Sequence, residues 1–450
     1  MQEFLYSDLK RCAETLRKQN RFEEAAKWYL RLLHEYPDQC DVWVYWGAAT
    51  SFVKLKRYRE AIMVCTTAQK IYPGNIYIYN VCSWAVFHAI IKKLNVHSLH
   101  KIYKAAKFIF KYCPDISPAN PRMPTLLEVM KYVDQQQIAY PEFLVQAAES
   151  VDIKLLSDRP TSFKSHNNVL SIASELEQYL SCMIDLYFDQ KKWDACVEYC
   201  DKALTSITSP HYNNRIWWTR TKALALVEMN EDDTAIRLLS DILQQKKEWF
   251  LFGDLAHVYY KIEQYGKSLD LALEAVLSNG TPKMKVNLYL LLAKCFEKNE
   301  IYAPIPDTLA LAVSIRKHNQ WNVPPALLKI SLRWQVFDVA PEDSTGLLKR
   351  CLPIWRRLWS ERQQWAFGTI SFLFEHGNAG FILRDTSRQS YYFKTEDFKG
   401  PLSKLKANTP VRFLLKEGFD KKKNIPTTVA FHIIPLSATP STGVDPITTN

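Results

Sequence analysis

The feature that most constrains the fold of this chain is a repeated arrangement of aromatic, small and proline residues. Tyr36-Pro37 and Tyr72-Pro73 each end a segment with a helical apolar period, and the two prolines lie 36 residues apart. That distance is close to the length of one helix–turn–helix unit. Because such a unit buries its apolar face only against its neighbours, the repetition predicts a stack of antiparallel helix pairs.

The second helix of each predicted pair carries its side chains in the same order. An aromatic residue opens the helix, a small residue follows three positions later, and a second small residue lies seven positions beyond. Small residues are expected where neighbouring helices approach most closely, because the distance between two helix axes depends on the side chains between them. The three clearest sets are Tyr58, Ala61 and Ala68; Trp193, Cys196 and Ala203; and Tyr265, Ser268 and Ala275.

This pattern resembles the tetratricopeptide repeat (TPR), most closely over Trp43–Pro73 and Phe252–Ala275. The resemblance covers roughly residues 1–115 and 170–320. It implies an all-α, TPR-like helical-hairpin solenoid in this part of the chain. Solenoids of this kind present extended concave surfaces, so the resemblance also implies that the concave face binds a protein or peptide partner.

Breaks in the repeat pattern divide the chain further. A proline-rich stretch and the polar segment 157–168 flank predicted helices near 125–137 and 142–156, and this insertion either joins two sub-arrays or covers the concave face. A later helix rich in tryptophan and arginine either caps the repeats or contacts nucleic acid. The predicted segments are TPR-like repeats at 1–115, a helical insertion or linker at 116–168, repeats at 169–346, a basic, tryptophan-rich linking helix at 347–365, a β-barrel at 366–435 and a disordered tail at 436–450.

From Ala366 the apolar period changes from that of a helix to the period of two that is typical of strands. Five short strands are predicted in about 70 residues, which is typical of a small all-β barrel of the OB type. Alternation predicts an inward-facing set of Ile370, Ile382, Phe393, Val411 and Phe413. The predicted strands are 368–374, 380–384, 390–394, 410–416 and 427–433.

The barrel sequence resembles the cold-shock domain. Gly368–Leu373 is similar to the first strand of that family, Gly377–Ile382 to its central motif, and Tyr391–Lys394 to its third strand. The resemblance implies that outward aromatic rings stack on the bases of RNA or single-stranded DNA. By position, the stacking residues are Phe372, Phe381 and Tyr392, joined by the nearby Phe374, with Lys394 in place of the family's histidine.

Two residues depart from the family pattern. Ala379 replaces the first aromatic residue of the central motif and Gly377 replaces its lysine, so one stacking surface and one charge are lost. The ring of Phe374 is expected to compensate. Basic residues near the predicted strands are expected to follow the phosphates of the nucleic acid and to make its affinity salt-sensitive. These residues are Arg384, Arg388, Lys394, Arg412, Lys421, Lys422 and Lys423.

The distribution of charge supports this assignment. The chain has a formal net charge of +11, and residues 348–450 hold 16 lysines and arginines against 8 acidic residues. The basic C-terminal part is therefore where a polyanion is expected to bind. We predict a non-enzymatic adaptor that binds RNA or single-stranded DNA through the barrel and a protein through the repeats. The alternative function is a protein-interaction scaffold with a degenerate barrel that binds no nucleic acid. The competing structural interpretation is that the repeats cover the aromatic rings and the barrel is a structural cap.

Other classes of function lack their signatures in the sequence. The N-terminus has no apolar signal segment, and the apolar run Val81–Ile91 is too short to cross a membrane, so a cytoplasmic, non-membrane protein is expected. Cys196 and Cys200 have no second ligand pair, and His97 and His100 have no accompanying cluster, so these residues are interpreted as structural. We expect no catalytic residues, no metal and no cofactor. An enzyme would need a polar cleft near the insertion at 157–168.

Overall fold

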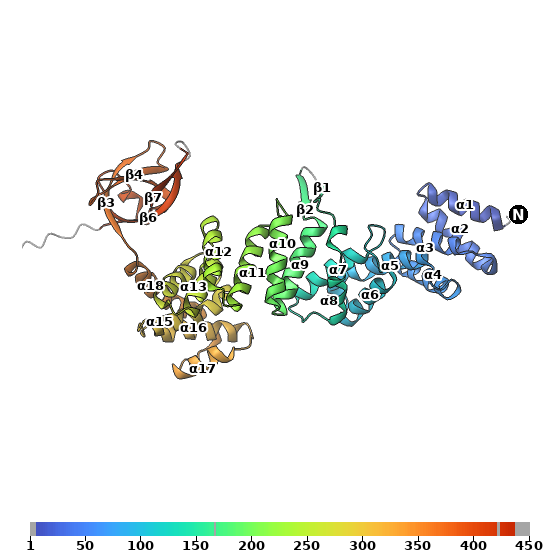
Figure 1. Ribbon diagram of the computed structural model, residues 1–450, viewed down its shortest axis with the longest axis horizontal. Coiled ribbons are helices and arrows are strands. Elements are labelled where there is room, and N and C mark those ends of the chain that lie inside the picture. Colours follow the sequence, from blue (N-terminus) through green and yellow to red (C-terminus); the bar gives the residue numbers. More distant parts are fainter. Residues whose placement is uncertain (1–5, 166–167, 421–423, 437–450) are drawn as a thin grey trace, which may run out of the picture. The chain divides into compact units, whose positions relative to one another are not determined.

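The computed structural model describes residues 6–165, 168–420 and 424–436. The chain forms two compact units, Met1–Lys247 and Glu248–Asn450. Within each unit, most helices that follow one another in sequence pack side by side as antiparallel neighbours (Figure 1). The predicted stack of helix pairs is therefore confirmed in each unit.

The first unit is almost entirely helical. A two-stranded antiparallel hairpin, β1 (Thr161–Ser165) and β2 (Asn168–Ile172), interrupts its helices. The helices are α1 (Tyr6–Lys18), α2 (Phe22–Glu35), α3 (Val42–Lys54), α4 (Tyr58–Ile71), α5 (Ile76–Ala89), α6 (Leu99–Tyr112), α7 (Arg122–Gln135), α8 (Glu142–Glu149), α9 (Glu175–Asp189), α10 (Trp193–Ser206), α11 (Asn214–Glu228) and α12 (Asp232–Gln245).

Three-residue turns of one geometry join several helix pairs. The central residue of each turn has a φ between 56° and 64°, and the next residue donates its N–H to the carbonyl five positions earlier, at 2.9 Å. This hydrogen bond is typical of a Schellman helix end, which satisfies a free carbonyl of the first helix and reverses the chain. The central residues are Asn20, Lys56, Lys191 and Asn230 in the first unit and Glu263 in the second.

The small residues of the repeat pattern lie where the sequence predicts. The six small residues of the three sets are all fully buried. Gly47 shows why bulk is excluded, because a Cβ at this position would lie 2.4 Å from the Tyr29 ring. Cys196 and Cys200 are likewise buried and free, which confirms that they are core residues.

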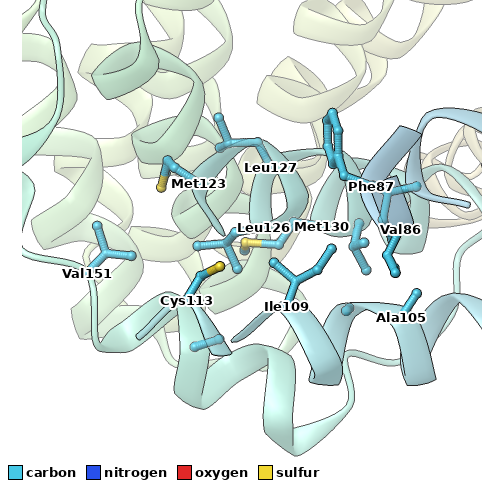
Figure 2. Close-up of a cluster of buried hydrophobic side chains, with 14 of the residues drawn as sticks. Val86, Phe87, Ala105, Ile109, Cys113, Met123, Leu126, Leu127, Met130 and Val151 are labelled. Atoms are coloured by element: carbon cyan, nitrogen blue, oxygen red, sulfur yellow. The ribbon is translucent and has the colours of Figure 1, made fainter. Parts of the chain in front are cut away.

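The insertion is packed into the first unit but is not wholly helical. Figure 2 shows side chains of α5, α6 and α7 gathered in one cluster, with Leu126 and Met130 of α7 beside Ile109 of α6. The polar segment 157–168, which was predicted as a break within a helical insertion or linker, contains a strand. Residues 161–165 pair with residues 168–172 as an antiparallel hairpin.

The second unit contains the remaining helices and the barrel. Its helices are α13 (Trp249–Lys261), α14 (Tyr265–Leu277), α15 (Val286–Lys298), α16 (Ile305–His318), α17 (Pro325–Arg333) and α18 (Ser344–Glu361). The linking helix was expected at 347–365, but α18 begins three residues earlier and ends at Glu361. Trp355 is fully buried and stacks on Tyr289, with ring centroids 5.6 Å apart, while Arg356 and Arg357 are exposed. These contacts favour the capping interpretation of α18.

Five strands form the C-terminal barrel: β3 (Ala366–Leu373), β4 (Ala379–Arg384), β5 (Ser390–Lys394), β6 (Pro410–Asp420) and β7 (Ile425–Pro435). They pair in the order β3-β4-β5-β7-β6, and β6 pairs again with β3. The link between β5 and β7 is a single parallel pair, Tyr392 with Val429, whereas the other pairs are antiparallel and longer. The barrel therefore has its fewest paired residues between β5 and β7.

The barrel core is the predicted one. Ile370, Ile382, Phe393, Val411 and Phe413 are all fully buried and belong to one cluster. Among the described residues, no helix is long and apolar enough to cross a membrane.

Candidate nucleic-acid interface

A β-bulge in β3 determines which aromatic side chains face outward. Ile370 pairs with Ile382 but Phe372 pairs with Phe381, so β3 has one extra residue at Ser371. Strict alternation would place Ile370 and Phe372 on the same face, whereas the bulge reverses the phase between them. As a result Ile370 is fully buried, Leu373 packs against the barrel core, and Phe372 is 51% exposed.

Four outward rings form one continuous surface, which we call the aromatic platform: Phe372, Phe374, Phe381 and Tyr392. The ring centroids of Phe372 and Phe374 are 5.3 Å apart, those of Phe374 and Phe381 5.8 Å, and those of Phe381 and Tyr392 5.9 Å. The pairs are edge-to-face or tilted, which are favourable arrangements for aromatic contacts. Phe372, Phe374 and Tyr392 are exposed and Phe381 is half-buried. The structure therefore brings together all four predicted stacking residues.

Two glycines lie next to this platform, one at a close approach of two strands and one in a turn. A Cβ at Gly380 would lie 2.4 Å from the Phe372 carbonyl oxygen, so β3 and β4 approach at this distance only because the residue is glycine. Gly377 has a φ of 66° in the turn between the same strands, with open space around it. Ala379 is buried at the start of β4 and adds no ring to the platform. Phe374, which follows β3, supplies the ring between Phe372 and Phe381 in the platform.

The predicted basic residues do not all lie at the platform. Lys394 shares the outward face of β5 with Tyr392, and its ammonium lies 3.1 Å from the Glu396 carboxylate. The hydrogen bond from Lys394 to Glu396 raises the pKa of Lys394, so the lysine stays charged. Arg384 is the last residue of β4, at the end away from the platform, and Arg388 follows it in the next turn. Arg384 is half-buried, and its Nε has no hydrogen-bond partner among the described residues. Lys421, Lys422 and Lys423 lie outside the described residues.

Arg412 was expected to accompany the platform, and its position differs from this expectation. Its guanidinium lies 4.4 Å from the centre of the Trp365 ring, next to α18. Pro410–Phe413 of β6 pairs with the start of β3, while the platform uses the end of β3, so the strand direction separates Arg412 from the rings. Sequence alternation identifies the outward direction of a side chain but not which part of the barrel surface it joins.

A second surface of the barrel, which we call the covered side, packs against α18. Leu414 is 4% exposed within a cluster that includes Trp355 and Trp359, and Phe431 packs against the same cluster. The His432 ring lies 4.7 Å from that of Trp359. Within the second unit, the barrel therefore contacts α18 through this surface and not through the four predicted rings.

The covered side depends on irregular backbone that the sequence does not reveal. Between Arg412–Leu414 on β6 and Phe431–Ile434 on β7 the pairing shifts by one residue, and His432 has a φ of 48°. Burial lowers the pKa of His432, and the nearby cations Lys399 and Arg412 lower it further, although Asp397 opposes them. The imidazole is therefore favoured in its neutral form against the indole rings.

A polar cluster near the hairpin has a structural explanation. Glu177 is 1% exposed, and its carboxylate accepts hydrogen bonds from the backbone N–H of His211 at 2.7 Å, from His211 Nδ1 at 2.8 Å and from Asn214 Nδ2 at 2.8 Å. His211 Nε2 lies 3.0 Å from Ser171 Oγ. A buried carboxylate requires such partners, and these bonds fix the loop between α10 and α11. Within the described residues, His, Cys, Asp and Glu form no group of three that could hold a metal ion.

Comparison with known proteins gives limited information. A family model described as a domain of unknown function (DUF7017) matches residues 216–351, which lie within the helical part and end before the barrel. No curated protein matches the chain significantly.

Solved structures with similarity to the chain include repeat proteins. A tetratricopeptide repeat protein from Parabacteroides merdae is 14% identical, covers 73% of this chain and 98% of its own, and has a TM-score of 0.29. The TPR2AB domain of yeast Sti1 in its pHSP90 complex is 13% identical, with 66% and 96% covered and a TM-score of 0.28. The human IFIT1 dimer with m7Gppp-AAAA is 11% identical, with 77% and 81% covered and a TM-score of 0.36. At these values the similarity assigns no function, and the TPR-like helix pairing rests on the helices described above.

Proposed function

We propose that this protein is a non-enzymatic adaptor that binds single-stranded nucleic acid, RNA in the first instance, by stacking bases on the aromatic platform. The observation that carries this proposal is the continuous set of four outward rings. Single apolar side chains on a surface are ordinary, but a contiguous patch of rings left in water indicates a binding surface. Aromatic rings with adjacent cations suit bases with little sequence preference, because every base has a π face.

The barrel supports the choice of ligand class. Its five strands and their pairing order fit an OB-type fold, and Gly368–Leu373 resembles the first strand of the cold-shock domain. Lys394 next to the platform and the surplus of basic residues after position 348 favour a polyanion. The helix pairs would meanwhile bind a protein partner through their concave surface, as stacked helical repeats commonly do.

The proposal is tested by titrating the full chain with a single-stranded RNA at a low and a high salt concentration. Phosphate contacts make affinity fall with salt. The double variant Phe372→Ala with Tyr392→Ala removes two rings of the platform, and each stacked base is worth roughly 1–3 kcal/mol. We therefore expect the double variant to bind at least about thirtyfold more weakly.

Phe367→Ala is the matched control, because Phe367 is 49% exposed on the same strand but is not part of the platform. It should leave the affinity for RNA almost unchanged. If the unmodified chain binds no RNA at low salt, the proposal is wrong and the protein-interaction scaffold becomes the better account. If the double variant binds as tightly as the unmodified chain, the platform is not the binding surface.

A further inference from the structure

A cleft of about 700 Å³ lies within the second unit, where the end of α14 and the end of α18 meet β6 and β7. Its lining includes three arginines, Arg356, Arg357 and Arg412, together with Trp359 and His432. Cavities of this size commonly hold small ligands. The cleft is built from the covered side of the barrel, so it is distinct from the aromatic platform.

The charges in the cleft are only partly neutralised. Arg357 lies 3.7 Å from Glu361 on the same helix. Arg412 is held against the Trp365 ring, and neither Arg356 nor Arg412 has an ion-pair partner among the described residues. A guanidinium that is positioned by an aromatic ring and lacks a carboxylate is ready to bind an anion.

His432 lies in the same lining as the arginines and is itself held in its neutral form. The pKa of His432 is lowered chiefly by burial, and then by the positive charges of Lys399 and Arg412. The interior of the cleft therefore disfavours further positive charge. Guanidinium groups recognise phosphate oxygens through paired N–H donors, so phosphate is the anion that this lining suits best.

Two carboxylates limit how a polyanion can lie in the cleft. Glu274 accepts a hydrogen bond from Trp359 Nε1 at 2.5 Å, and Glu361 is the partner of Arg357. A nucleic-acid strand that continued through the cleft would bring further phosphates toward these carboxylates. A strand that ends there would place one group, with up to two negative charges, near the three arginines.

We infer that the cleft binds the terminal phosphate of a single-stranded nucleic acid. The inference rests on the proposed function, since it adds a second contact for the same ligand. The platform supplies affinity for bases in any strand, and the cleft supplies a preference for strands with a phosphorylated end.

The test compares three oligonucleotides of one sequence: one with hydroxyl groups at both ends, one with a 5′-phosphate and one with a 3′-phosphate. Each is titrated into the full chain at the same salt concentration. One phosphorylated form should bind about tenfold more tightly than the hydroxyl form, which is the scale of charge-assisted hydrogen bonds to one phosphate group. Equal affinity for all three oligonucleotides would overturn the inference.

Variants assign the preference to the cleft. Arg356→Gln and Arg412→Gln should each reduce the preference for the phosphorylated end severalfold and leave the affinity for the hydroxyl form within about twofold. The matched control is Arg350→Gln, because Arg350 lies on the same helix but pairs with Asp307 at 3.2 Å and is not part of the cleft lining. If Arg350→Gln removes the preference as strongly as Arg356→Gln, the cleft is not its origin.

The two proposals fail in different ways. If the hydroxyl-ended oligonucleotide does not bind, the proposed function is wrong, whatever the ends do. If it binds and Phe372→Ala with Tyr392→Ala weakens it, but phosphorylation changes nothing, the platform stands and the cleft inference alone is wrong.

Discussion

The aromatic platform and the covered side of the barrel both carry aromatic rings, but only the rings of the covered side pack against a helix. On the covered side, Phe431 and His432 of β7 pack against α18, where the His432 ring contacts Trp359, which is 8% exposed. On the aromatic platform, Phe372 is 51% exposed, and its ring lies against that of Phe374, which also faces outward. Burying a large apolar side chain stabilises a protein by roughly 1.5–3 kcal/mol, so the platform forgoes much of this gain. The two surfaces therefore differ in how much of their aromatic area is buried: the covered side is packed against α18, whereas the rings of the platform remain largely in contact with water.

The largest expected effect is a difference in stability between variants of the covered side and variants of the aromatic platform. Leu414→Ala removes a side chain that is 4% exposed and packs with the tryptophans of α18, and should lower the free energy of unfolding of the second unit by about 2–5 kcal/mol. Phe372→Ala, on the aromatic platform, should change it by no more than about 0.5 kcal/mol. Chemical denaturation of the full chain, with hydrogen exchange of barrel amides as the local measurement, checks both values. Similar losses for the two variants would remove the distinction between the sides.

The sequence predicted the fold in those segments where apolar or small residues recur at a regular helical or strand spacing. Ala61 and Ala68 mark the helix packing, because small residues at a fixed helical spacing are typical of positions where two helices approach closely. The strands were found because the apolar period changes to two at Ala366, and the predicted bounds of β5 agree with the structure. The hairpin at 161–172 was missed, since its strands have only five residues each and β1 is mainly polar, so the sequence there shows no sustained apolar period.

The sequence predicted which residues form the candidate site but not how they lie relative to one another. Ile370 inside and Phe372 outside are incompatible with strict alternation, and only the bulge at Ser371 allows both. The positions of Arg412 and His432 beside α18 depend on the register shift between β6 and β7 and on tertiary packing. Local sequence patterns contain no information on such contacts between distant segments.

A smaller change in RNA affinity tests whether the surface around the aromatic platform binds a polyanion. Glu396→Gln removes the carboxylate that pairs with Lys394, so the lysine becomes available to a phosphate and RNA affinity should rise a few-fold at low salt. Lys394→Gln should do the reverse and make the dependence of log affinity on log salt concentration shallower by about 0.7. Titrations at three or more salt concentrations measure both. Lys27→Gln, an exposed lysine of α2, is the control and should leave the slope unchanged.

The smallest expected effect concerns the covered side and its dependence on pH. The pKa of His432 is lower in the folded protein than in the unfolded chain, where it is about 6.5. The folded state therefore binds fewer protons, and its stability from this residue is fully present above about pH 6.5 and decreases as the pH falls below that value. His432→Asn should remove this dependence, and asparagine tolerates the positive φ of 48° better than most residues.

The measurement is the unfolding midpoint of the unmodified chain and of His432→Asn at pH 7.5 and at pH 5.5. Other titrating groups are common to both proteins, so only the difference between them reports on His432. The unmodified chain should lose more stability on acidification than His432→Asn does. An equal loss would mean that the imidazole is not sheltered by Trp359 and Trp365, and the covered side would then be as open to water as the platform.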